Sequence, residues 1–170
     1  MSVWGASLIA LFTWWFATGL ILLVIRSADR TGGNAYNRAV FFAVPVLALG
    51  VAGVILSTSD ATLIGLYKGF FGALAIWGWI ELSFLSGVIT GPERADRPDG
   101  VSGTDRFWRA WDALAYHEVL LLAGLAFIVI ATTGADNTIA MCTYAILFFA
   151  RISAKLNLFF GVPRINFEFL

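Results

Sequence analysis

The chain has 170 residues, no formal net charge, 59% hydrophobic residues and only 13% charged residues. A soluble domain carries about 25% charged residues, so this composition, with a mean hydropathy of +0.83, predicts a membrane protein. A chain without net charge or a basic patch lacks the groups that bind phosphates, which excludes a nucleic-acid partner and leaves membrane lipids as its surroundings. Cys142 is the single cysteine, so an internal disulfide is excluded.

Five apolar runs are long enough to cross a membrane. A hydrocarbon core of ~30 Å needs about 20 apolar residues in a helix, and helices satisfy their own backbone groups in lipid. The runs cover residues 4–25, 39–56, 63–90, 113–133 and 138–162. We therefore expect one all-α, polytopic membrane domain over residues 1–170. No Lys or Arg precedes the first run, so we expect a retained helix there and not a cleaved signal.

Basic residues alternate between the connecting segments. The segments after the first and third runs contain Arg26, Arg30, Arg38, Arg94, Arg97, Arg106 and Arg109. The segments after the second and fourth runs contain none. Because basic loops stay in the cytoplasm, we expect a periplasmic N-terminus, a cytoplasmic loop over residues 91–112 and a cytoplasmic C-terminus of this chain. Lys68 is the exception, and we expect it to snorkel to the outer interface.

A short interfacial helix is predicted at the end of the cytoplasmic loop. Phe107, Trp108 and Trp111 share one helical face there, while Arg106 and Arg109 lie elsewhere. An aromatic face of this kind suits the headgroup level of a membrane. The segment should therefore lead along the interface into the fourth spanning helix.

Ionisable residues inside the predicted spans are the first candidates for function, since each costs about 2.5–3.5 kcal/mol on insertion scales. With the expected topology, five of them fall in the cytoplasmic half of the membrane: Glu81, His117, Glu118, Arg151 and Lys155. Glu81 would lie about nine residues before the end of its helix, ~13 Å deep at about 1.5 Å per residue. Arg151 and Lys155 are one turn apart, where two cations repel, so we predict that Glu81 and Glu118 face them.

Three roles for this group of charges remain open. It could be an ion-pair cluster that holds the last three helices in register. It could bind a polar ligand head or a partner helix, or it could form a proton or ion path. The broken, repeated helices typical of a transport path are not evident in the sequence.

His117 is the one histidine, and two interpretations of it remain open. A neutral imidazole could ligate the metal of a tetrapyrrole, and it could equally be a satisfied interfacial side chain. One histidine beside one glutamate is too few ligands for a zinc or di-iron site. Nucleophilic triads, phosphate loops and dinucleotide fingerprints do not occur, so we expect no enzyme activity.

Small residues recur along the third span. Gly65, Gly69 and Ala73 follow each other at intervals of four residues. Such a stripe allows two helices to approach closely in a membrane. We predict a helix-packing face there.

Three blocks of sequence together resemble one known family. They are "WGWIELSFLSGVITGPE" (residues 77–93), "AYHEVLLLAG" (115–124) and "RISAKLNLFFGVPRINFEFL" (151–170). The chain is similar, through these blocks, to the photosynthetic complex assembly protein 2 family, also called PuhE. Its genes lie near that of the reaction-centre H subunit in purple bacteria. Members normally continue beyond the "EFL" of residues 168–170 with further membrane segments, so the resemblance implies a longer full-length design.

The resemblance implies an assembly factor or accessory subunit of the reaction centre and its light-harvesting complex in the bacterial inner, intracytoplasmic membrane. The matching polar positions are Glu81, His117, Glu118, Arg151, Lys155 and Asn157. The partners would be reaction-centre and light-harvesting subunits, with bacteriochlorophyll, carotenoid or quinone as candidate ligands at a partner interface. The alternative is a membrane enzyme or carrier for a bacteriochlorophyll- or quinone-type ligand.

Overall fold

The computed structural model describes residues 2–90 and 103–161, with the side chains of 103–111, 113 and 158–161 left aside. The described residues form helices and contain no strand. The helices are α1 (Val3–Thr31), α2 (Ala35–Phe42), α3 (Val44–Ser57), α4 (Leu63–Leu85), α5 (Gly103–Thr132) and α6 (Ile139–Gly161). Five segments are long and apolar enough to cross a membrane, with α2 and α3 together forming one of them. The predicted all-α, polytopic class is confirmed.

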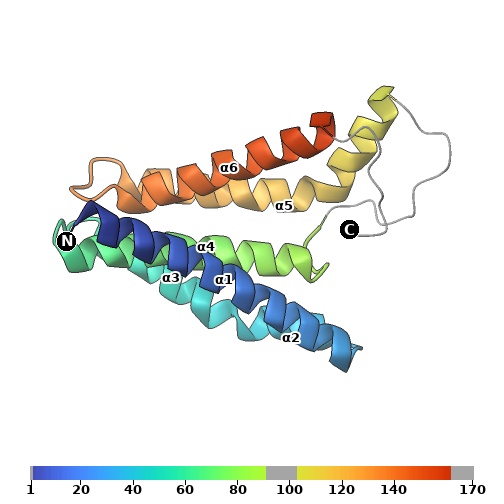
Figure 1. Ribbon diagram of the computed structural model, residues 1–170, viewed down its shortest axis with the longest axis horizontal. Coiled ribbons are helices and arrows are strands. Elements are labelled where there is room, and N and C mark those ends of the chain that lie inside the picture. Colours follow the sequence, from blue (N-terminus) through green and yellow to red (C-terminus); the bar gives the residue numbers. More distant parts are fainter. Residues whose placement is uncertain (1, 91–102, 162–170) are drawn as a thin grey trace.

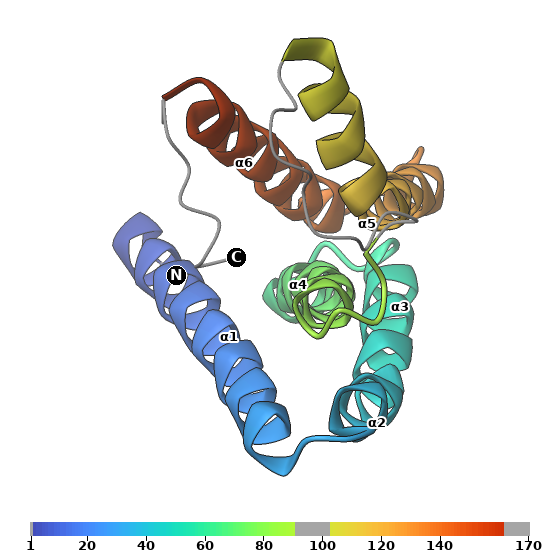
Figure 2. The ribbon, with the colours of Figure 1, turned by 90° about the vertical axis from the view of Figure 1, so that its right-hand side faces the viewer.

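Consecutive spanning segments run in opposite directions, as Figure 1 shows. Helix α4 lies at the centre of the bundle when it is viewed end-on in Figure 2, and it contacts α3, α6, α5 and α1. The hydrophobic core connects all four helices from α3 to α6. Its buried side chains include Val54, Ile80, Leu121 and Tyr144, one from each helix. Helix α1 lies on one side of the bundle. No residue is buried in its most apolar stretch of 18 residues.

The second span is broken into two helices. Helix α2 ends at Phe42 and α3 begins at Val44, with Pro45 in its first turn. Proline lacks a backbone N–H and is tolerated only at the start of a helix. The single helix expected over residues 39–56 is therefore wrong in this detail, because Pro45 forces a new helix to begin.

Helix α4 ends earlier than the predicted residue 90. Its last residue is Leu85, and Gly87 follows with a left-handed φ of +69°. The N–H groups of Val88 and Ile89 then donate to the carbonyl of Ser83, which ends the helix. Glu81 consequently lies four residues, about 6 Å, from the helix end. Measured along the helix, the expected ~13 Å between Glu81 and the helix end is therefore corrected to about 6 Å.

The segment expected to be interfacial belongs to the same helix as the fourth span. Helix α5 begins at Gly103, inside the predicted loop 91–112, and continues to Thr132. Figure 1 shows its first turns leaning away from the direction of its later part. The side chains of Phe107, Trp108 and Trp111 lie outside those described.

The closest helix crossing joins α3 to α4. A Cβ on Gly72 would lie 2.8 Å from the carbonyl oxygen of Gly50 and 2.9 Å from the backbone nitrogen of Val54. The predicted stripe of Gly65, Gly69 and Ala73 is buried, but the closest backbone approach to α3 is at Gly72. Gly65 is closest to Asp60 of the α3–α4 turn, and Gly69 is close to Ile139 at the start of α6 and to the hydroxyl of Ser57 at the end of α3.

Candidate functional site

Three helices bring five of the six predicted polar residues together. Glu81 comes from α4, His117 and Glu118 from α5, and Arg151 and Lys155 from α6; we call these five residues the charge layer. Nη1 of Arg151 lies 2.7 Å from Oε1 of Glu81 and 2.8 Å from Oε2, and its N–H donates to Oε2. Nζ of Lys155 donates to Oε1 of Glu118. Each base on α6 therefore faces an acid from a different helix.

The local folds explain why these side chains meet. Glu81 lies in the last turns of α4, and His117 lies where α5 passes the end of that helix. The backbone N–H of His117 donates to the carbonyl oxygen of Thr90 at 3.0 Å, which ties the segment after α4 to α5. Arg151 and Lys155 are one turn apart on α6, so that one helix face reaches both acids.

His117 sits between the two acids and is fully buried. Its Nδ1 lies 3.4 Å from Oε1 of Glu118, and its Nε2 lies 3.8 Å from Oε1 of Glu81. Neither ring nitrogen makes a hydrogen bond within the described residues. The imidazole therefore lies next to both ion pairs but makes no hydrogen bond to either acid.

Three buried polar atoms of the charge layer have no hydrogen-bond partner among the described residues: Nδ1 and Nε2 of His117 and Nε of Arg151. An unsatisfied buried polar group costs about 1–3 kcal/mol. Native proteins retain such groups at functional sites or satisfy them with ordered water. These atoms make the charge layer a candidate functional site within the described part of the chain.

Phe84 is a member of this site that sequence reasoning missed. Its ring lies 4.2 Å from the imidazole of His117, between centroids, and 5.3 Å from Cζ of Arg151. A cation over an aromatic face is attracted by the ring's negative face. The signal available in the sequence is its position three residues after Glu81, on the same side of the helix.

Two predicted residues differ from the others in their surroundings. Asn157 is exposed and lies outside the charge layer, so its predicted binding of a ligand or partner stays a prediction. The ring of His117 has no exposed surface, and Phe84 packs on it. In this arrangement the two acids and Phe84 surround the imidazole, and its predicted role as a tetrapyrrole ligand stays a prediction.

Lys68 lies at the opposite end of the bundle, in the first turns of α4. Its Nζ lies 3.4 Å from Oδ2 of Asp60, and 45% of its side chain remains exposed. The hydroxyl and N–H of Thr62 bind the Asp60 carboxylate and hold its pKa below the ordinary value, and Lys68 adds to this. The side-chain amide of Asn137 donates to the backbone carbonyl of Asp60 at 2.9 Å. At this end of the bundle, hydrogen bonds and an ion pair therefore connect the α3–α4 turn, which contains Asp60, to the α5–α6 turn, which contains Asn137.

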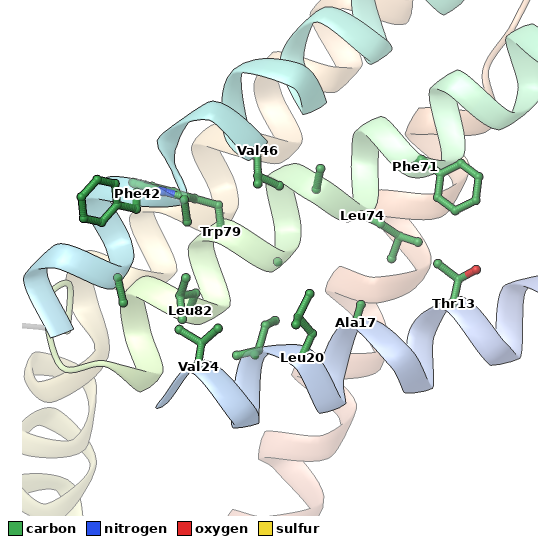
Figure 3. Close-up of a pocket in the computed structure, with 15 residues that line it drawn as sticks. Thr13, Ala17, Leu20, Val24, Phe42, Val46, Phe71, Leu74, Trp79 and Leu82 are labelled. Atoms are coloured by element: carbon green, nitrogen blue, oxygen red, sulfur yellow. The ribbon is translucent and has the colours of Figure 1, made fainter. Parts of the chain in front are cut away.

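A cavity of about 530 Å³ lies between α1, the α2–α3 break and α4. In Figure 3, Ala17, Leu20 and Val24 of α1 face Leu74 and Leu82 of α4 across it. Its lining is apolar apart from the hydroxyl of Thr13 and the indole of Trp79, whose N–H already donates to the carbonyl of Val40. It can hold apolar chains and provides little for chemistry.

Comparison with known proteins places the chain in a family. The family described as "Protein of unknown function (DUF3623)" matches residues 1–170. The chain is 44% identical over 167 residues to the "Uncharacterized 30.4 kDa protein in puhA 5'region" of Rhodobacter capsulatus. It covers 61% of that relative, which is therefore a longer protein. No solved structure matches the chain significantly. The match over all 170 residues shows that this chain belongs to the DUF3623 family.

Proposed function

We propose that the chain is an assembly factor or accessory subunit of the bacterial reaction centre and its light-harvesting complex, and that it acts by binding partner helices. The observation that carries the proposal is the loose attachment of α1. Figure 2 shows this helix standing apart from the others, and large apolar side chains such as Trp4, Trp15 and Leu23 are more than half exposed. A helix held this loosely can meet a second helix in the membrane without disturbing the bundle.

The gene position of the relative supports a photosynthetic role. Its name puts it in the 5′ region of puhA, which agrees with the gene neighbourhood that the resemblance implies. We therefore propose the bacterial inner, intracytoplasmic membrane as the location. Reaction-centre and light-harvesting subunits are the proposed partners.

Partner binding is proposed in preference to catalysis. The acids and bases of the charge layer neutralise each other through the Glu81–Arg151 and Glu118–Lys155 pairs, which holds α4, α5 and α6 together. A carrier or enzyme for a bacteriochlorophyll- or quinone-type molecule is the second candidate. The apolar cavity of about 530 Å³ favours it, because cavities of roughly 300–1,000 Å³ suit small ligands.

Co-purification from native membranes tests the assembly role. The tagged full-length protein should recover reaction-centre and light-harvesting chains after mild solubilisation, identified by mass spectrometry. Arg151→Ala, which leaves Glu81 unpaired, should lower the level of assembled complex. Lys68→Ala removes a cation at the other end and is the matched control. Recovery of none of these chains, with unchanged complex levels in the Arg151→Ala strain, would refute the proposal.

The proposed orientation has its own test. Arg26, Arg30 and Arg38 belong to the segment where α1 ends and α2 begins, which Figure 1 shows at the same end of the bundle as the start of α5, on the right. The positive-inside rule then makes this end cytoplasmic. In a Cys142→Ala background, an impermeant maleimide added from the periplasm should label Ser59→Cys and leave Asn34→Cys unlabelled. The reverse pattern would overturn the orientation.

A further inference from the structure

A second cavity lies between α1, α4 and α6 and reaches the charge layer. Its volume is about 340 Å³. Trp14 and Ile21 of α1, Leu74 of α4 and Leu147 of α6 provide much of its apolar lining, and Glu81 and Arg151 also line it. It is thus an apolar space with one ion pair in its wall.

Arg151 has N–H groups that the ion pair with Glu81 does not use. A guanidinium carries five N–H donors, and Glu81 is the one described residue that accepts a hydrogen bond from Arg151. The side chain of Arg151 keeps 23% of its surface exposed, and that of Glu81 keeps 12%. Leaving polar groups against hydrocarbon is costly, so a polar ligand atom over this pair would be favoured.

Size and charge limit what can occupy the cavity. A helix is about 10–12 Å across with its side chains, too wide for this space, whereas a single alkyl or isoprenoid chain fits it. Glu81 already neutralises Arg151. A second anion would therefore leave an uncompensated charge near the hydrocarbon, while a neutral oxygen acceptor would not.

We propose that this cavity binds one neutral, membrane-soluble molecule with a single hydroxyl or carbonyl head. The head oxygen accepts a hydrogen bond from Arg151, and the apolar chain lies between Trp14, Leu74 and Leu147. This site is independent of the proposed function, since it needs neither a partner helix nor a photosynthetic complex.

Photo-crosslinking of the purified full chain in phosphatidylcholine nanodiscs tests the site. Three diazirine probes with the same chain length are compared: 1-hexadecanol, palmitic acid and hexadecane. The alcohol should label the cavity-lining peptides of α1 and α6 about tenfold more than hexadecane, the advantage of one hydrogen bond to a charged group. Mass spectrometry of the labelled peptides gives the ratio.

Variants of the chain separate the site from general contact with lipid. Ala150→Phe places a ring in the cavity and should reduce labelling by the alcohol to the hexadecane level. Ala123→Phe, exposed on α5 and lining neither cavity, should leave it unchanged. Arg151→Met should remove the preference for the alcohol while chain labelling persists. Ala154 also lines the cavity, so Ala154→Phe replaces Ala150→Phe as the blocking variant if Ala150→Phe does not fold.

Two results would overturn the inference. Equal labelling by all three probes, insensitive to Ala150→Phe, would mean contact with bulk lipid only. A preference for palmitic acid would exclude a neutral head. Either result leaves the co-purification test of the proposed function standing, because the nanodisc experiment contains no photosynthetic chain.

Discussion

Helix α4 packs in two different ways on its two sides. Toward α3, Gly72 meets Gly50, and each glycine lies so close to the partner backbone that a Cβ would fall within about 3 Å of it. Toward α1, Gly78 has only the end of Ile21 within reach, 3.8 Å from where its Cβ would be. A glycine allows close approach only where the facing helix also presents a small residue. The α1 side consequently keeps two cavities, while α3 and α4 approach each other backbone to backbone at Gly50 and Gly72.

Removing Glu81 should have the largest effect, and it acts on the side of α4 that faces α6 and the second cavity. Glu81→Ala leaves the partly buried Arg151 without its acid and should lower the free energy of unfolding by about 3 kcal/mol, the usual result of breaking a buried ion pair. Thermal denaturation in detergent micelles measures this. The double variant Glu81→Ala/Arg151→Met should recover much of the loss. Equal stability of the single and double variants would show that the pair does not hold α4 to α6.

Paired glycine substitutions address the comparison directly. Gly72→Leu forces a side chain against the backbone of Gly50 and should destabilise the protein by about 2–3 kcal/mol. Gly78→Leu enters space beside Ile21 and should change stability by less than about 0.5 kcal/mol. Similar losses in the two variants, measured by the same denaturation, would contradict the difference between the two sides.

A smaller effect is expected where α5 meets α6. The hydroxyl of Tyr144 is buried and donates to the carbonyl of Leu121 at 3.1 Å, while its ring packs on Trp77 of α4. Tyr144→Phe keeps the ring and should cost about 1 kcal/mol for the lost hydrogen bond. Tyr116→Phe, on an exposed side chain of α5, is the matched control. A Tyr144→Phe variant as stable as this control would show that the hydrogen bond contributes nothing.

The smallest effect on stability is expected for Asp60, at the end of the bundle opposite the charge layer. This effect depends on pH. The bonds from Thr62, aided by Lys68, lower the pKa of Asp60 in the folded state. Its stabilisation is therefore present above the unfolded pKa of about 3.9 and is lost as the pH falls through the folded value. Melting temperatures recorded from neutral to acidic pH should fall less steeply at the acidic end for Asp60→Asn. An unchanged slope would show that the carboxylate of Asp60 does not stabilise this end of the bundle.

Hydropathy along the chain was sufficient to predict the membrane-spanning segments and the charges that lie in them. Hydropathy depends on composition over about 20 consecutive residues, so the five spans were predictable, with the α2–α3 break and the early end of α4 as local errors. The need to neutralise Arg151 and Lys155 also predicted acids facing them. Asn157 shared the charged helix in the sequence, but its exposed position removed it from the charge layer.

The faces along which the helices meet could not be predicted in this way and are known from the assembled bundle. Lipid is as apolar as a protein core, so a spanning helix is hydrophobic all round and its pattern does not mark the buried side. The stripe Gly65, Gly69 and Ala73 was visible in the sequence, yet Gly72 makes the closest contact with α3 because Gly50 lies opposite. For the same reason, the burial of His117 between two acids and the loose packing of α1 became evident only once the helices were assembled.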